Sequence, residues 1–511
     1  MKKLTAVGLL ACGLAFGQGR PMDWPSVGND AQRTGWEKVD ARITKDSTKD
    51  FRLVLKRKLE APKGILTPPV VLGLLISYRG FKELGFVHSN SGDLWAIDLD
   101  VDKIFWHRHL GNATGVCAGI SVAAPALTPP INFAAPRPRP ITPGNAVAPP
   151  EYVPAPRPIG RAALTAGGFG SPRPLFVVSG DGKIHLLNTS TGEESMPAMD
   201  FLPANAKASS LTMLEGTVYA ATTDGCQGTQ NGIWAVNLTG GDPKEPPVVS
   251  SFPLNGGGVS GLGEMAFGLD GTVYVQTGPG ETDPSSNKWS STLLVLSPKE
   301  LKLKDYFTVP TPGKAPVVTP VVFSYQSREF VVTAGTDGSL YLLDAKSPGG
   351  SDHKTPVAQT PPVTAPGGKI WGGLSTWQEA DGTRWILAPV WGGVNPELKF
   401  TASGPAPNGS VVAFKIEEHE DKLSLIPAWM SCDMNSPQPP VITSGVVFAL
   451  AAGGPHATLY AFDGATGKEI YSTGDQITVP ANLTGITLAN GRVLFSTIDN
   501  TLYGFGIYLE R

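Results

Sequence analysis

The chain has 511 residues and a formal net charge of −3, with 41% hydrophobic but only 17% charged residues. The near-neutral charge disfavours nucleic acid and anionic membrane surfaces as partners. Glycine (61) and proline (47) are abundant, as expected for many short strands joined by tight turns within one large closed β fold.

Residues 1–17 are predicted to form a secretory signal peptide. Lys2 and Lys3 precede an apolar run over 4–16, and residues 15–17 give a small-x-small cleavage pattern. The run is too short to span a bilayer as a stable anchor, so we expect no transmembrane segment. The alternative is a lipoprotein signal acylated at Cys12. Both interpretations predict an exported chain, periplasmic or extracellular.

After an expected N-terminal arm over 18–50, one sequence pattern recurs through residues 51–511. It consists of short apolar strands separated by glycine and polar turns, at spacings near those of propeller blades. Its third strand, which ends in a polar residue or glycine, is the easiest to align. Eight copies are present, at 94–98, 184–188, 233–237, 293–297, 340–344, 411–415, 459–463 and 502–506. The sequence therefore predicts an all-β fold, an eight-bladed β-propeller of four-stranded antiparallel blades.

The two ends of the propeller predict how the ring closes. The last copy supplies three strands within 483–509, whereas the strand at 51–59 precedes the first copy and has no blade of its own. Pairing these N- and C-terminal strands completes blade eight and removes a sheet edge. Seven blades plus an unrelated tail is the alternative.

Three cysteines remain once the signal is removed, Cys117, Cys226 and Cys432. An oxidising compartment permits one disulfide among them. Cys117 and Cys226 belong to adjacent blades, which makes them the candidate pair. The alternative is that the cysteines are isolated small hydrophobic residues.

The stretch 124–174 differs in kind from the repeats. It contains fourteen prolines, five arginines and one acid, Glu151, inserted between the first and second strands of blade two. Such a composition predicts an extended segment that serves as a spacer or a tether for a partner. A tolerated insertion without function is the alternative.

Three stretches resemble a known group of proteins. GDLWAIDLDVDKIFW (92–106) and TLYAFDGATGKEIY (458–471) resemble the repeat of pyrroloquinoline-quinone (PQQ) enzymes, and DWPSVGNDAQRTGW (23–36) resembles the start of mature quinoprotein alcohol dehydrogenases. The resemblance implies the quinoprotein-type propeller fold, and its catalytic members imply PQQ with calcium as cofactors. The same repeat also builds non-catalytic periplasmic propellers.

The sequence departs from the catalytic members of that group. It has no adjacent cysteines to form their vicinal disulfide and no Cys-x-x-Cys-His motif for haem attachment. The tryptophan that closes the repeat is recognisable at Trp106, is replaced by Tyr471 in another blade, and is not recognisable elsewhere. Neither the calcium ligands nor the catalytic aspartate of the group is assignable to numbered residues.

The expected blade geometry places several long loops on one face. The loops between second and third strands are extended at 224–232, 278–291 and 391–409, in blades three, four and six. In a propeller these loops share a face with the segments that lead into the innermost strands. We expect a ligand or a partner protein to bind there, because binding sites commonly lie in loops held by a rigid scaffold.

Two kinds of residue are candidates for a site at the channel. Trp371 and Trp377 alternate along an innermost strand and are candidates for stacking a planar cofactor or a sugar ring; packing between blades is the alternative. Glu264 leads into the innermost strand of blade four and is a candidate ligand or catalytic base; a solvated turn acid is the alternative.

No motif in the sequence predicts a metal site. His107 and His109 share one face of a strand, but that strand is the outermost of blade one, where a solvated edge accounts for them. We therefore expect a ligand- or partner-binding scaffold with no assigned cofactor. The alternative function is a PQQ- and calcium-dependent dehydrogenase of alcohols or sugars.

Overall fold

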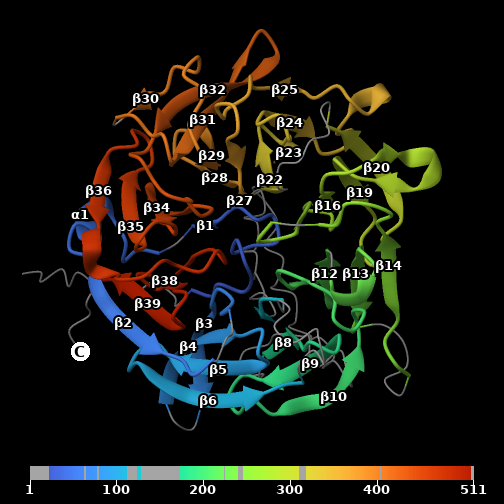
Figure 1. Ribbon diagram of the computed structural model, residues 1–511, viewed down its shortest axis with the longest axis vertical. Coiled ribbons are helices and arrows are strands. Elements are labelled where there is room, and N and C mark those ends of the chain that lie inside the picture. The colour runs from blue at the N-terminus through green and yellow to red at the C-terminus, as the bar shows by residue number, and fades with distance from the viewer. Residues whose placement is uncertain are drawn as a thin grey trace, which may run out of the picture.

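The computed structural model describes residues 22–38, 40–61, 65–77, 80–111, 123–127, 173–223, 225–239, 245–259, 261–309, 318–402 and 404–507. Eight mainly antiparallel sheets are arranged in a ring around a central channel (Figure 1). The predicted eight-bladed, four-stranded propeller is confirmed. The signal peptide, Cys12, Cys117 and most of the proline-rich stretch lie outside the described residues.

The first four blades follow one another along the chain. Blade 1 contains β3 (Val70–Ser77), β4 (Gly80–His88), β5 (Asp93–Asp98) and β6 (Lys103–His109). Blade 2 contains β7 (Ala126–Leu127), β8 (Pro174–Val178), β9 (Lys183–Asn188) and β10 (Glu194–Asp200). Blade 3 contains β11 (Thr212–Leu214), β12 (Thr217–Thr222), β13 (Gly232–Asn237) and β14 (Val249–Pro253). Blade 4 contains β15 (Met265–Phe267), β16 (Val273–Gln276), β19 (Thr292–Leu296) and β20 (Leu303–Thr308).

The remaining blades repeat the pattern, and the last one uses a strand from the start of the chain. Blade 5 contains β22 (Val321–Tyr325), β23 (Arg328–Ala334), β24 (Leu340–Asp344) and β25 (Ala358–Gln359). Blade 6 contains β28 (Ser375–Gln378), β29 (Arg384–Trp391), β31 (Gly409–His419) and β32 (Lys422–Met430). Blade 7 contains β33 (Val441–Thr443), β34 (Val446–Ala451), β35 (Thr458–Asp463) and β36 (Glu469–Ser472). Blade 8 contains β37 (Thr487–Ala489), β38 (Arg492–Ser496), β39 (Thr501–Gly506) and β2 (Arg52–Lys58).

Several short strands and one helix lie outside the four-stranded pattern of the blades. They are β1 (Trp36–Glu37), α1 (Lys45–Thr48), the hairpin of β17 (Thr282–Asp283) and β18 (Lys288–Trp289), the parallel pair of β21 (Val318–Thr319) and β27 (Gly372–Gly373), β26 (Lys369–Ile370) and β30 (Thr401–Ala402). Helix α1 begins at Thr44, whose side chain accepts a hydrogen bond from the backbone N–H of Ser47 in a capping box. Among the described residues, no helix is long and apolar enough to cross a membrane.

The ring closes as the sequence predicts. Strand β2 pairs antiparallel with β39, from Arg52 opposite Gly506 to Lys58 opposite Thr501. The blue β2 lies beside the red β39 in Figure 1. Buried side chains of β2, including Leu55, join the apolar layer between blades 7, 8 and 1. This pairing covers the edge that β39 would otherwise expose, and β2 becomes the outermost strand of blade 8.

The innermost strands all run from one face of the ring to the other, so the two faces can be told apart. We call the face with the segments leading into these strands, and with the loops between second and third strands, the loop face. The opposite face, which carries the turns between first and second strands, is the turn face. The long loops at 278–291 and 391–409 are on the loop face, as are the described residues of 224–232.

The central channel is filled by the chain's own N-terminal residues 22–37, which we call the channel segment. At the turn face, the backbone N–H of Met22 donates a 2.7 Å hydrogen bond to Oδ1 of Asn490, which lies in the turn after the innermost strand of blade 8. Beyond it Trp24 pairs antiparallel with Val71 of blade 1, so the chain rises toward the loop face. It then turns, and β1 descends parallel to β33 of blade 7. The segment is therefore a hairpin inserted from the turn face.

The channel segment reaches the innermost strand, or the turn after it, of every blade. Met22, Trp24 and β1 contact blades 8, 1 and 7. The segment makes hydrogen bonds to each of the remaining five blades. These join Pro25 O to Leu127 N of blade 2, Arg33 to Thr212 of blade 3, Ala31 O to Phe267 N of blade 4, Gln32 O to Val322 N of blade 5, and Thr34 O to Thr376 N of blade 6. The segment's backbone groups thereby satisfy inner-strand N–H groups that would otherwise line an open channel.

The tryptophan that closes the repeat is present twice among the described strands. Trp106 of β6 donates from Nε1 to Thr189 O of the next blade at 2.9 Å. Trp429 of β32 does the same to Gly464 O at 2.8 Å, and its ring packs against Gly467, whose φ is +71°. The sequence interpretation that no tryptophan beyond Trp106 is recognisable is therefore wrong. It missed Trp429 because the β31–β32 hairpin is longer than its counterparts, which moves this residue away from the third-strand signature.

We expect Trp429→Phe to lower the free energy of unfolding by about 2 kcal/mol, because the buried carbonyl of Gly464 loses its donor and the smaller ring leaves space. Urea denaturation of wild type and variant measures this difference. Trp371→Phe is the matched control, since Trp371 is only half-buried. Equal losses in the two variants would contradict the closing role of Trp429.

Candidate functional site

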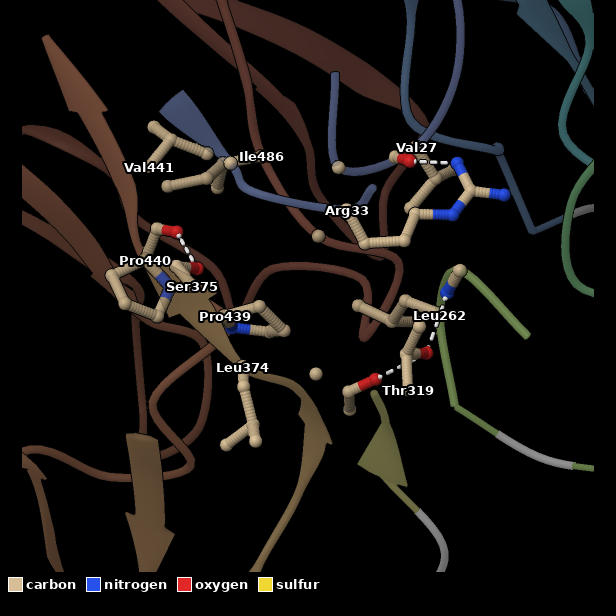
Figure 2. Close-up of a pocket in the computed structure, with 16 residues that line it drawn as sticks. Val27, Arg33, Leu262, Thr319, Leu374, Ser375, Pro439, Pro440, Val441 and Ile486 are labelled. Carbon is tan, nitrogen blue, oxygen red and sulfur yellow. Dashed lines mark hydrogen bonds between the residues drawn. The ribbon is translucent and has the colours of Figure 1, made fainter. Parts of the chain in front are cut away.

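The mouth of the channel on the loop face holds a small apolar cavity above the channel segment (Figure 2). Its volume is about 40 Å³. The walls come from the tip of the channel segment and from the residues that lead into the innermost strands of blades 4 to 8. They are mostly glycine, proline and aliphatic residues, among them Gly28, Leu262, Gly372, Pro439 and Ile486. A space of this size holds water molecules and no larger group.

Arg33 is the one charged residue lining this cavity, and its guanidinium is engaged by the protein. Its Nε donates to Met265 O at 2.8 Å, Nη1 to Ser26 Oγ and Val27 O, and Nη2 to Thr212 Oγ1. Burial lowers the pKa of Arg33 to about 10, although the nearby carboxylate of Glu264 opposes this shift. Each of its three nitrogens thus has a protein acceptor, and Arg33 fixes the hairpin tip rather than facing a ligand.

A second cavity of about 120 Å³ lies next to the first on the same face and shares Leu262 with it. It lies among segments leading into blades 1, 3 and 8, and its walls include Leu66, Pro68 and Ala208. Ile65 and Leu483 line it while remaining 48% and 44% exposed. The Oγ1 atom of Thr484 in its wall is buried and has no hydrogen-bond partner among the described residues. The cavity has a mainly apolar wall and an exposed apolar rim, to which Thr67, Asn90, Ser209 and Thr484 add polar groups.

Glu264 lies at the channel but does not face the mouth. It is 1% exposed and adopts a left-handed backbone conformation with φ +60°. Its Oε2 accepts from Ala221 N at 2.8 Å, and its Oε1 accepts from Ser209 N. Burial raises its pKa to about 7, against the lowering effect of these backbone N–H groups and of Arg33. In this position the carboxyl group joins blade 4 to blade 3.

The two candidate tryptophans lie in different environments. Trp377 is buried between blades 6 and 7, where its ring stacks on Trp385 with centroids 5.0 Å apart. This placement corresponds to the packing alternative. Trp371 is half-buried at the loop face and stacks on Trp391 with centroids 4.6 Å apart, and the Nζ atom of Lys369 lies 4.6 Å from the Trp391 ring. The structure therefore brings Trp371 to the channel rim without Trp377.

Cys226 is disulfide-bonded, and Cys432 is a free thiol. The partner of Cys226 lies outside the described residues, so the pairing with Cys117 stays a prediction. We expect peptide mapping without reduction to recover Cys117 linked to Cys226. A peptide linking Cys226 to any other cysteine would contradict this pairing.

We expect Cys432 to react slowly with alkylating agents at neutral pH. Burial raises the pKa of its thiol to about 11, which reduces the reactive thiolate roughly a hundredfold relative to an unperturbed cysteine. Iodoacetamide labelling followed by mass spectrometry measures the rate, and the same protein in denaturant is the control. Equal rates in the native and denatured protein would contradict this prediction.

The residues around the loop-face mouth of the channel do not fit a PQQ and calcium site. A fused-ring quinone with three carboxylates needs a larger space than either cavity offers, and it needs cationic partners, whereas Arg33 is already engaged. No group of three or more His, Cys, Asp or Glu residues in the described part of the chain is arranged to hold a metal ion. Glu264 directs both carboxylate oxygens at backbone N–H groups.

Comparison with known proteins supports the fold. No protein-family model matches the chain, and no curated protein sequence is detectably similar to it. Among solved structures, it is similar to the quinohemoprotein alcohol dehydrogenase of Comamonas testosteroni, with 15% identity over 96% of this chain and 81% of that chain and a TM-score of 0.60.

It is also similar to a europium-containing methanol dehydrogenase, with 14% identity over 95% of this chain and 98% of that one and a TM-score of 0.58. The quinohemoprotein alcohol dehydrogenase ADHIIG of Pseudomonas putida HK5 gives 12% identity over 95% and 80% of the two chains and a TM-score of 0.58. At these identities the likeness shows the quinoprotein-type propeller fold alone.

Proposed function

We propose that this chain is an exported, non-catalytic binding propeller whose loop face receives an apolar side chain from a partner protein. The observation that carries the proposal is the cavity of about 120 Å³ beside the filled channel. A cavity of about 150 Å³ with aliphatic and aromatic walls accommodates benzene. The space of about 120 Å³ is somewhat smaller, so it suits one aliphatic side chain of leucine size or less.

The surroundings of the cavity support a peptide-like ligand. Ile65 and Leu483 extend the apolar surface beyond the cavity, and burial of such exposed side chains favours association. The unpaired Oγ1 of Thr484 offers one hydrogen bond to a polar group beside the inserted side chain. Loops from blades 3, 4 and 6 are long enough to add contacts around the mouth.

Export is part of the proposal and has its own support. The signal-like residues 1–17 predict it, and the disulfide at Cys226 fits an oxidising compartment. We expect the exported form to begin at Gln18. Mass spectrometry of the protein from the exported fraction tests this start, and a lipid-modified Cys12 or an uncleaved leader would contradict it.

The binding proposal is tested with a displayed peptide library selected on the purified protein. Selected peptides are expected to share a large apolar residue and to lose most of their affinity for Ile65→Asp/Leu483→Asp. Val357→Asp/Ile426→Asp is the matched control, because exposed Val357 directly precedes the fourth strand of blade 5 and exposed Ile426 lies in the fourth strand of blade 6, both away from the mouth. Peptides that bind all three proteins equally would overturn the proposed site.

The dehydrogenase alternative is tested on the same protein. Incubation with PQQ and calcium, followed by absorbance spectroscopy and dye-linked oxidation of alcohols and sugars, is expected to show neither binding nor turnover. Stoichiometric PQQ binding with dye reduction would overturn the non-catalytic proposal.

A further inference from the structure

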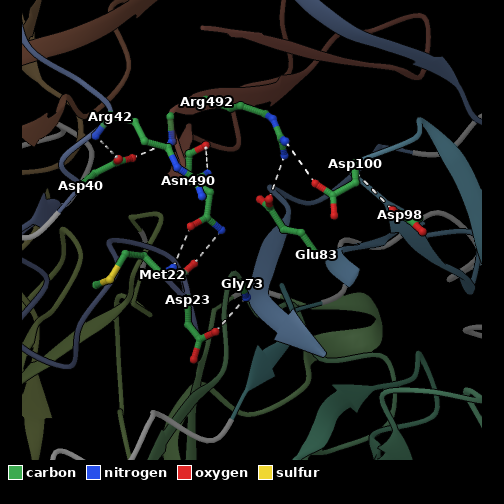
Figure 3. A network of polar contacts seen from close by, with 11 residues as sticks. Met22, Asp23, Asp40, Arg42, Gly73, Glu83, Asp98, Asp100, Asn490 and Arg492 are labelled. Carbon is green, nitrogen blue, oxygen red and sulfur yellow. Dashed lines mark hydrogen bonds and ion pairs between the residues drawn. The ribbon is translucent and has the colours of Figure 1, made fainter. Parts of the chain in front are cut away.

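The two ends of the channel are held by different kinds of contact. At the turn face, Asn490 binds Met22 through both its side-chain Oδ1 and Nδ2 atoms, and Nη1 of Arg42 donates to the Asn490 carbonyl at 3.0 Å (Figure 3). At the loop face, the two cavities have mainly apolar walls and share Leu262. An apolar ligand therefore finds its space at the loop face, and Leu262 is the wall that the two parts of this space have in common.

The backbone around Leu262 is fixed by its neighbours. Its N–H donates to Gly372 O at 2.9 Å, and the next N–H, of Gly263, donates to Thr319 Oγ1 at 3.0 Å. A Cβ atom on Gly263 would lie 3.0 Å from Arg33 Nε, so this turn also packs against the tip of the channel segment. Figure 2 shows Leu262 between Arg33 and Thr319. These contacts hold the side chain of Leu262 at one place in the mouth.

The side chain of Leu262 extends from blade 4 toward the segments that lead into blades 6 and 8. Its Cδ1 atom would lie 3.1 Å from a Cβ atom on Gly485 and 3.6 Å from one on Gly372. These two glycines have φ values of +90° and +82°, a backbone conformation that other residues rarely adopt. The mouth therefore leaves room for a branched side chain at position 262, and that side chain separates the two cavities.

The size of the larger cavity depends on this partition. At about 120 Å³ it is smaller than the cavity of about 150 Å³ that accommodates benzene, whereas the two cavities taken together slightly exceed that volume. Removal of the isobutyl group of Leu262 would join them and would add the volume that the group itself occupies. The joined space would suit a phenylalanine-sized ring, which neither cavity holds alone.

We propose that Leu262 is the specificity-determining residue of the loop-face site, which it limits to aliphatic side chains by excluding aromatic ones. The inference rests on the proposed function, because it concerns the side chain that the partner inserts. The partner is then a protein segment that presents leucine, isoleucine or valine. Discrimination by the size of an apolar space is about 10- to 200-fold for one methylene group, so an effect of at least this order is expected for a ring.

The test compares synthetic peptides that carry the flanking sequence selected from the displayed library and differ only at the inserted residue, leucine or phenylalanine. In calorimetric titrations, wild type is expected to bind the leucine peptide at least about tenfold more tightly. Leu262→Ala is expected to lose this preference, and Leu262→Val to give an intermediate ratio. Leu374→Ala is the matched control, because Leu374 is a buried leucine that lines the smaller cavity and not the larger one. Its ratio is expected to equal that of wild type.

A second measurement tests the cavities without any peptide. Benzene is expected to raise the melting temperature of Leu262→Ala, because a ligand that binds only the folded state stabilises it. The melting temperature of wild type is expected to stay unchanged. A cooperative urea denaturation curve shows that the variant is folded.

Two outcomes would overturn the role of Leu262. One is an unchanged ratio of leucine to phenylalanine affinity in Leu262→Ala, and the other is a benzene effect that is equal in wild type and variant or absent from both. A library that yields no apolar peptide would overturn the proposed function, and with it the peptide preference. The benzene comparison would then still decide whether Leu262 separates the two cavities.

Discussion

Arg33→Ala is expected to lower the free energy of unfolding by roughly 3–5 kcal/mol, the range for removing one partner from a buried charged network. The side chain reaches from the channel segment to blade 3 through Thr212 and to blade 4 through Met265. Its loss leaves the buried Glu264 without the nearby positive charge that lowers its pKa. Urea denaturation followed by tryptophan fluorescence measures the change.

Arg328→Ala is the matched control for that experiment. Arg328 pairs with Asp344 at 2.8 Å on the surface, where such a pair is worth at most about 1 kcal/mol. Arg33→Lys gives a further comparison, because a lysine keeps the charge but cannot hold four acceptors in the guanidinium geometry. An Arg33→Ala protein as stable as Arg328→Ala would show that the channel segment is not required to stabilise the ring.

Stability is expected to fall as the pH rises through the range in which Glu83 and Glu264 ionise. Burial raises the pKa of each to about 7, above the ordinary value near 4.5 that holds in the unfolded chain. Below pH 4.5 the two carboxyl groups are protonated in both the folded and the unfolded chain. Between pH 4.5 and 7 they lose their protons only in the unfolded chain. Each carboxyl group therefore contributes a loss of about 3 kcal/mol that is complete above pH 7.

The measurement compares each variant with wild type at several pH values. His88 opposes the two acids, because burial lowers its pKa to about 4, so stability is also lost as the pH falls below 6.5. Glu83→Gln and Glu264→Gln are therefore each expected to flatten the decline between about pH 4.5 and 7 by about 2–3 kcal/mol relative to wild type. Asp270→Asn is the control, since Asp270 has a lowered pKa and lies on the surface. Identical slopes in wild type and both glutamine variants would contradict the assignment.

The ring was predictable because its signals are local. Each third strand carries its own alternating apolar residues and turn residues, and those short patterns recur eight times. The closing pair was equally readable, since an unmatched strand at 51–59 and an incomplete last repeat leave one simple solution. Both inferences depend on patterns within single strands and turns, although the two strands of the closing pair lie at opposite ends of the chain.

The site was less predictable because it depends on contacts between distant parts of the chain. The channel segment, 22–37, has neither strand alternation nor a helical period, and it is held by the inner strands of seven blades and by the turn after the inner strand of blade 8. Nothing near Arg33 in sequence indicates that Thr212 and Met265 will accept its hydrogen bonds. A buried arginine cannot be distinguished by sequence pattern from an exposed one.

The candidate residues illustrate the same limit. Trp371 and Trp377 share a local pattern, yet their surroundings differ because blade 7 covers one and the loop face leaves the other half-open. Glu264 was recognisable as unusual within a glycine-rich turn, but its partners, Ser209 and Ala221, belong to another blade. Sequence identified the places of interest without identifying what each side chain touches.

The channel segment also has an evolutionary consequence. Repeat folds change size readily by duplicating or losing one unit, because each unit contacts only its neighbours. Here the residues of one segment, 22–37, together contact every unit around the circle. A ring of nine blades would have a wider channel, and one inner strand would lack a contact with the channel segment. A ring of seven blades would have a channel too narrow for the segment. A piece of chain outside every repeat thus holds the repeat number at eight.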